Sequence, residues 1–313
     1  MSTEELLQKS VDTTDLAAGG LMNPQQFERY VNLVVEQTAM IRHSRRVSMR
    51  SPIVELDKIA TNGRVSKVKA EGVAPSALSD PAFSKVTLTC KELITPFEIT
   101  FEALEDSIEQ GNLEQTIISA MAKQTATDIE ELAVNGDTAS TDPFLAAFDG
   151  WRKLADDGHV VDVTGSTLDK TAVSRMYRAL PSKYKRNHAD LRFFFAPAVT
   201  QDWHDAFADR GTVGGDAVLT GANVPPYMGI PIISAPMVPT NLAGVGDFTG
   251  TNLSFGFLTP AENLIFGVHR DVRVEKDKDI LRGVNVYAIT TRIAVELEQD
   301  DAVVVAVNVG QAA

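Results

Sequence analysis

The 313-residue chain contains a single cysteine, Cys90, so one chain can form no internal disulfide and no thiolate metal cluster. We interpret Cys90 as a small apolar residue in a strand. The sequence also lacks an apolar run close to the roughly 20 residues that span a bilayer. Glu4 and Glu5 stand where a secretory signal carries basic and then apolar residues. We therefore expect a protein that stays in the compartment where it is made and does not contact a membrane.

Basic residues are scarce, since 29 Lys and Arg face 42 Asp and Glu and give a net charge of −13. A dedicated nucleic-acid binder gains affinity by neutralising phosphates with Lys and Arg, so this balance argues against that class. The local exception is a group of four arginines: Arg42, Arg45, Arg46 and Arg50. Three interpretations stay open: pairing with acidic patches of a neighbouring subunit, which we favour, a solvated face, or contact with DNA.

Motifs for catalysis or cofactor binding are also missing. The sequence has no phosphate-binding loop, no dinucleotide-binding glycine pattern and no Gly-x-Ser-x-Gly elbow for a serine nucleophile. None of the five histidines has another at the i, i+4 spacing of two metal ligands on a helix. His204 lies between Trp203 and Asp205, but adjacent helical residues point in different directions. The sequence therefore predicts no catalytic, cofactor-binding or metal-binding residue, and we expect no enzyme activity.

The first 101 residues read as an arm followed by a hairpin. Residues 1–50 are polar apart from an amphipathic stretch, Gln25–Met40, which is too short for an independent domain. Val54–Ile59 and Arg64–Lys69 alternate apolar and polar residues around Asn62-Gly63, a dipeptide that favours a tight hairpin turn. Further strand-like runs end at Phe101. Because an isolated hairpin is marginal in water, we expect this excursion to rest on another chain.

The remaining residues predict one long helix, a mixed region and a strand-rich end. Apolar residues recur at near-helical spacing over Leu113–Val134, about 33 Å of helix, with Asn112 as its cap and Gly136 past its end. From about residue 149 to 252, helices headed by Asp169 and Pro197 alternate with short strands, and residues 210–227 read as a long loop. Residues 253–309 are nearly all strand-like.

This order of elements resembles the Hong Kong 97-type major capsid proteins of tailed phages. Leu93–Asp106 is similar to the strand and turn that lead into the family's spine helix, and Glu131–Asp137 to the exit of that helix. Tyr227–Met237 resembles the family's Gly-Ile/Val-Pro-Val strand. Its closing strands are resembled by three segments: Phe266–Glu275, Asp279–Arg292 and Asp301–Val305. The resemblance implies an α+β fold with an N-terminal arm (1–50), an extended loop (51–95), a peripheral domain (96–149 and 255–313) and an axial domain (150–254).

The resemblance also implies a function and partners. The chain would be a structural subunit that assembles into pentamers and hexamers of an icosahedral head in the host cytoplasm, enclosing double-stranded DNA without reading its sequence. It implies a portal, a separate scaffolding protein and, as an option, a cement protein as partners. An encapsulin-like nanocompartment, an enzyme without a familiar motif and a ligand-binding module stay open as alternatives. The predicted inter-subunit contact residues are Arg42, Arg45, Arg46, Lys58, Asn62, Lys67, Lys69, Gly214, Gly215, Asp277, Asp279 and Arg282.

The type member of that family joins a Lys of its extended loop to an Asn in a neighbour's peripheral domain, with a Glu nearby taking the proton. The present sequence has loop lysines, but the Asn position falls on Gly283 and the Glu position on Thr290. Asn285 lies two residues further on, on the same strand face as Gly283, and would still lack the acid. We therefore expect a shell without covalent crosslinks, stabilised by non-covalent burial of the loop and arm or by a cement protein.

Overall fold

A computed structural model describes residues 39–60, 66, 82–106, 113–208, 225–242 and 252–311. Several expectations lie outside these residues: most of the amphipathic stretch Gln25–Met40, nearly all of the predicted strand Arg64–Lys69 and most of the loop 210–227. The same holds for five predicted contact residues: Asn62, Lys67, Lys69, Gly214 and Gly215. Within the described part, no helix is both long and apolar enough to cross a membrane.

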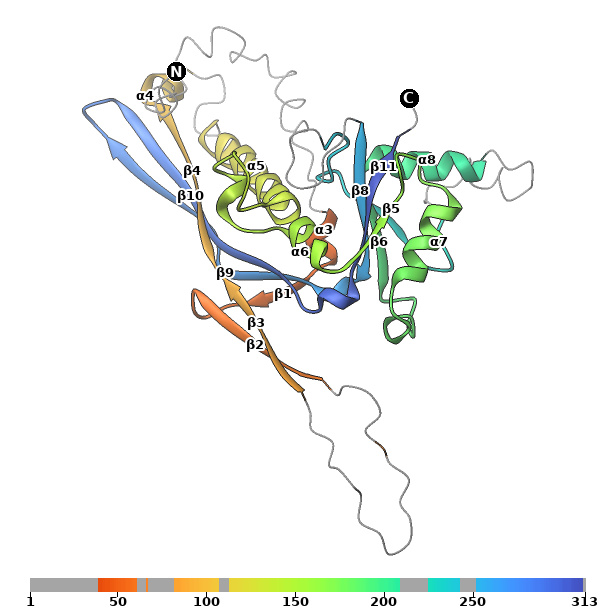
Figure 1. Ribbon diagram of the computed structural model, residues 1–313. Helices are drawn as coiled ribbons and strands as arrows, with labels where there is room; N and C mark the ends of the chain where they lie inside the picture. The colour runs from red at the N-terminus through yellow and green to blue at the C-terminus, as the bar shows by residue number, and fades with distance from the viewer. Residues whose placement is uncertain are drawn as a thin grey trace, which may run out of the picture.

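A four-stranded sheet forms the long body on which α5 lies (Figure 1). Its strands, in spatial order, are β1 (Arg45–Ser48), β9 (Leu264–Asp279), β10 (Val284–Leu297) and β4 (Lys91–Thr100). β1 runs parallel to β9, whereas β10 is antiparallel to both β9 and β4. The helix α5 (Leu113–Asn135) confirms the predicted long helix and packs on one face of this sheet, where Thr125 Oγ1 lies 3.2 Å from Thr95 Oγ1.

A five-stranded sheet forms the second body. Its spatial order is β5 (His159–Asp162), β11 (Val304–Gly310), β8 (Leu253–Pro260), β6 (Leu191–Phe195) and β7 (Ile232–Ser234). Asp169 caps α7 (Lys170–Ala179) by accepting the Ala172 N–H at 2.7 Å, as predicted, and α8 (Pro197–Ala208) follows β6. The proline-flanked β7 lies at the sheet edge, where its missing donors cost least.

The predicted domain boundary at residue 255 does not follow these two sheets. β8 and β11 pair with each other and with strands of the second body, while β9 and β10 belong to the first. Residues 255–313 therefore supply strands to both sheets. The sequence shows that these residues are strands, but the partner of each strand depends on contacts between residues far apart in the chain.

A two-stranded hairpin projects from the first body (Figure 1). β2 (Ile53–Ala60) pairs antiparallel with β3 (Ala82–Thr89) along its whole length. At the base, Leu88 is buried with Met49, Ile265 and Ala294. Ile53, opposite Thr89 at the base, is 55% exposed, and Phe83, toward the far end, is 73% exposed. The hairpin therefore leaves part of its apolar surface uncovered within its own chain, and its contact with another chain stays a prediction.

Short helices complete the described chain and link the bodies. They are α3 (Ala39–His43), α4 (Phe101–Asp106), α6 (Trp151–Leu154) and five described 3₁₀ turns at Leu145–Ala147, Ala155–Asp157, Ser182–Tyr184, Ala261–Asn263 and Asp300–Ala302. One apolar core runs under both sheets, with Met40 of α3, Trp151 of α6 and Phe257 of β8 each fully buried in it. The bodies therefore share a core and stabilise each other.

The exit of α5 is fixed by close backbone contact and a buried ion pair. A Cβ at Gly136 would lie 2.4 Å from the Phe148 carbonyl oxygen, so the chain passes itself too closely for any side chain. Just beyond, Asp137 Oδ2 lies 3.6 Å from Arg152 Nη2, and both side chains are 1% exposed. Burial lowers the pKa of Arg152, and Asp137 opposes that effect. The Asn-Gly-Asp sequence thus anchors the helix end to α6.

Replacing Asp137 by Asn should lower the free energy of unfolding by about 3–5 kcal/mol, because a buried guanidinium loses its anionic partner. Asn retains an oxygen that can accept the Ala139 N–H, which Asp137 Oδ1 accepts at 2.9 Å. The control is Asp271→Asn, which breaks an exposed pair with Arg46 and should cost about 0–1 kcal/mol. Urea unfolding of the unassembled chain measures both, and equal costs would contradict the role given to the buried pair.

Candidate inter-subunit contact surfaces

The arginine cluster lies at one edge of the first sheet, with Arg42 on α3, Arg45 and Arg46 on β1, and Arg50 just after β1. β1 runs beside β9, and Arg46 Nη2 reaches Asp271 Oδ2 at 3.0 Å, while Arg45 Nη1 reaches Glu298 Oε2 at 3.0 Å. Arg42 and Arg50 are exposed. Two of the predicted contact residues thus have acidic partners within their own chain. Exposed pairs of this kind contribute about 0–1 kcal/mol each, so they can exchange partners at little cost.

The hairpin places Lys58 near the arginine cluster. Its Nζ donates to the backbone carbonyl of Glu298, the residue whose carboxylate pairs with Arg45. Across the hairpin, Lys85 Nζ lies 2.5 Å from Glu55 Oε2. The Lys58 contact joins β2 to the residue that follows β10, whereas the Lys85–Glu55 pair joins the two hairpin strands. The apolar side chain of Phe83 stays exposed.

The turn between β9 and β10 forms an apolar tip with charges behind it. Ile280 is 81% exposed and Leu281 is 99% exposed. Asp279 Oδ1 accepts the Leu281 N–H at 3.1 Å and the Arg282 N–H at 3.2 Å, which fixes the turn. Arg282 donates to both carboxylate oxygens of Glu98, at 2.8 and 2.7 Å. Two predicted contact residues, Asp279 and Arg282, therefore hold the turn that presents the tip, and the third, Asp277, is exposed on β9.

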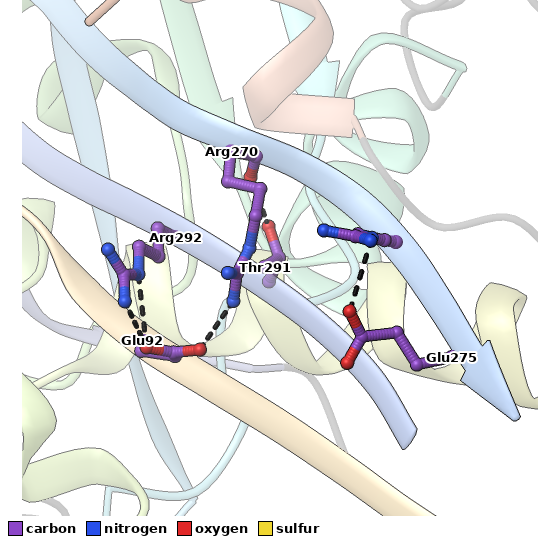
Figure 2. A network of polar contacts seen from close by, with 6 residues as sticks. Glu92, Arg270, Glu275, Thr291 and Arg292 are labelled. Atoms are coloured by element: carbon purple, nitrogen blue, oxygen red, sulfur yellow. Dashed lines mark hydrogen bonds and ion pairs between the residues drawn. The ribbon is translucent and has the colours of Figure 1, made fainter. Parts of the chain in front are cut away.

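The sheet face opposite α5 carries a charge network that sequence reasoning missed (Figure 2). Glu92 accepts hydrogen bonds from Arg270 and, at 3.0 and 2.7 Å, from Arg292. These bonds, from Arg292 first, hold the pKa of Glu92 below its ordinary value. Beside them, Arg273 Nε lies 3.2 Å from Glu275 Oε1. Only the register, which sets Arg292 opposite both Glu92 and Arg270, brings the first three together.

The same face contains the position that the resemblance aligns with the crosslinking acid. Thr290 pairs with Ile94 and Arg273 and is 7% exposed. Asn285 is 4% exposed and lies five positions away, so the alternation of a strand directs it to the opposite face. The nearby Glu92 is ionised and engaged by two arginines, which makes it a poor proton acceptor. On this face of β10, therefore, no described carboxylate that is free to accept a proton lies beside an Asn.

The helix turn around Trp203 is a packing element. Trp203 is 1% exposed and donates its Nε1–H to the Pro225 carbonyl at 2.9 Å. His204 Nδ1 lies 3.7 Å from Asp205 Oδ1 at the surface. No group of three or more His, Cys, Asp or Glu side chains that could hold a metal occurs among the described residues. What the described chain offers is contact surface: a projecting hairpin, an apolar tip and exchangeable charges.

Comparisons with known proteins agree on one family. The model of the phage capsid family matches residues 19–308 of this chain. A prophage capsid protein of Bacillus subtilis (strain 168), YqbE, is 36% identical over 312 residues, which cover 99% of each chain.

Solved structures share the fold at low sequence identity. The capsid of a native GTA particle has a TM-score of 0.68 at 15% identity and covers 96% of this chain and 99% of its own. The satellite phage P4 procapsid has a TM-score of 0.62 at 13% identity, covering 99% and 98%. Gordonia phage Cozz matches with a TM-score of 0.62 at 15% identity and covers 87% of each chain. The fold is therefore the α+β Hong Kong 97-type fold expected from the sequence, and the chain belongs to the phage capsid family.

Proposed function

We infer that this chain is the major capsid protein of a phage head, a structural subunit of the virion. The observation that carries the inference is the full-length match to a prophage capsid protein, together with a fold shared by capsids. The physical properties agree. A subunit with a net charge of −13 does not hold DNA tightly, which suits a container that must fill and empty.

The exposed apolar side chains support assembly as the way in which the subunit gains stability. Phe83 on the hairpin, Leu281 at the tip and Ile94 on the sheet are each more than half exposed. Covering such side chains contributes roughly 1.5–3 kcal/mol each when burial is complete. Symmetric copies of one chain can supply that cover repeatedly, since each copy presents the same surfaces.

The domain division and the contact residues belong to this proposal. The arm would be residues 1–50, the extended loop 51–95, the peripheral domain 96–149 and 255–313, and the axial domain 150–254. Within the peripheral range, β8 and β11 complete the second sheet. Arg42, Arg45 and Arg46 would meet acidic residues of adjacent copies, and residues 210–227, with Gly214 and Gly215, would lie near the five- and six-fold axes. A density map of the particle with these residues far from every other copy would overturn the assignment.

Partners follow the same reasoning. The proposal includes pentamers and hexamers, a portal, a separate scaffolding protein and room for a cement protein, with assembly in the host cytoplasm. It also includes the absence of catalysis. A nanocompartment shell that cages an enzyme is the alternative within the fold, and the 36% identity to a prophage capsid protein favours the phage.

The chain expressed with its neighbouring scaffold gene should form closed icosahedral particles in negative-stain electron microscopy. Leu281→Asp should reduce particle yield, because it puts a charge on an apolar tip that assembly would cover. The side chain is 99% exposed, so the melting temperature of the unassembled chain should stay within about 1 °C of the parent. A discrete small oligomer from the parent chain would contradict the proposal.

Mature particles should carry no covalent crosslinks. An amine attacks an amide only when a nearby base removes its proton, and the aligned acid position is Thr290, beside a Glu92 already held by two arginines.

Particles boiled in detergent should therefore give one band near 33.9 kDa on a gel. A ladder of species too large to enter the gel would show that crosslinks form by another pair of residues.

A further inference from the structure

Glu130 is a buried carboxylate that contacts the start of α3. It lies on α5 and is 1% exposed, next to the fully buried Met40. Its Oε1 accepts the Met40 N–H at 2.6 Å and the Ile41 N–H at 3.4 Å. These are first-turn amides, which have no acceptor within their own helix. One side chain of the long helix thus satisfies the backbone at which α3 begins.

The second carboxylate oxygen of Glu130 makes the ionised form of this side chain unfavourable. Oε2 is buried and has no hydrogen-bond partner among the described residues, and no salt bridge to Glu130 occurs there. An ionised carboxylate in this position loses its hydration without full replacement. Burial accordingly raises the pKa of Glu130 to about 7, against the opposing effects of the two amides and of Arg42. Undocking α3 uncovers the carboxylate and returns it toward its ordinary pKa of 4.5.

We propose that Glu130 is a proton-coupled clasp: α3 docks on α5 with uptake of a proton, which controls how firmly the N-terminal segment is anchored where it joins the body. The clasp acts within one chain and does not require shell assembly. The direction of the pH dependence follows from the linkage between proton binding and docking. A pKa raised in the docked state means that docking is favoured by low pH and weakens as the pH rises from about 4.5 through about 7.

His43 on the same helix acts in the opposite direction. Its ring centroid lies 6.2 Å from that of Phe194, and burial first, then Arg192 and Arg42, lower its pKa from 6.5. A lowered pKa means that protonation of His43 weakens docking as the pH falls. The two groups act in opposite directions, so a measurement on the parent chain alone mixes their contributions. The contribution of His43 cancels when the amide protection factor of the parent is divided by that of a variant that keeps His43.

The test is amide hydrogen exchange at Met40 and Ile41 in the full, unassembled chain, corrected for intrinsic exchange rates at each pH. The parent is compared with Glu130→Gln, a neutral isostere that retains the accepting oxygen. The ratio of parent to variant protection factors should fall roughly tenfold between pH 6 and pH 8. Glu131→Gln is the control, because Glu131 is exposed and has no hydrogen bond to α3 in the described structure, and it should follow the parent. A ratio independent of pH would overturn the clasp.

A second variant covers the case in which Glu130→Gln does not fold. In His43→Gln, Glu130 remains the titrating group that contacts α3, so protection should fall with rising pH by up to about tenfold per unit between pH 5 and 7. Flat protection over that range would equally overturn the proposal. Neither result depends on whether the chain forms a shell, so a failure of the clasp and a failure of the capsid function are distinguishable.

Discussion

The antiparallel pairing of β9 with β10 is the interaction on which the rest of this molecule depends. It runs from Leu264–Leu297, at the shared core, out to Asp279–Val284 at the exposed turn. β10 also pairs with β4, and β9 with β1, so this one ribbon positions the hairpin base, the arginine cluster and the Glu92 network. Its inner end enters the core that lies under both sheets. Because the hairpin base, the arginine cluster and the apolar tip are all attached to these two paired strands, the register of the pair fixes their relative positions.

Local sequence patterns were sufficient to predict the elements. The stripe of apolar residues and Gly136 predicted α5 almost to the residue, and Asp169 predicted the start of α7. Helix periodicity and helix caps depend on residues within a few positions of each other, so the sequence alone is enough to predict them. The strand-like character of residues 253–309 was also identified, and within it residues 264–279 form one long strand, β9.

Long-range partners could not be read from the sequence. Strands at 253–260 and 304–310 joined the second sheet, against the predicted boundary, because strand partners are chosen by packing between distant residues. Arg45 and Arg46 found acidic partners in their own chain, and Glu92 met Arg270 only through the register of three strands. Glu130 gave no signal at all, since a glutamate on a long helix usually faces water. These residues were missed for one reason: their roles depend on tertiary contacts between residues far apart in the chain.

The central claim is that copies of this chain cover one another's exposed apolar surfaces. Hydroxyl-radical footprinting of the same protein before and after assembly tests it, with oxidation of Phe83 and Leu281 as the readout and the buried Trp151 as the internal reference. The account predicts that oxidation of Phe83 and Leu281 falls several-fold on assembly while that of Trp151 stays constant. Unchanged oxidation of both side chains in closed particles would contradict it.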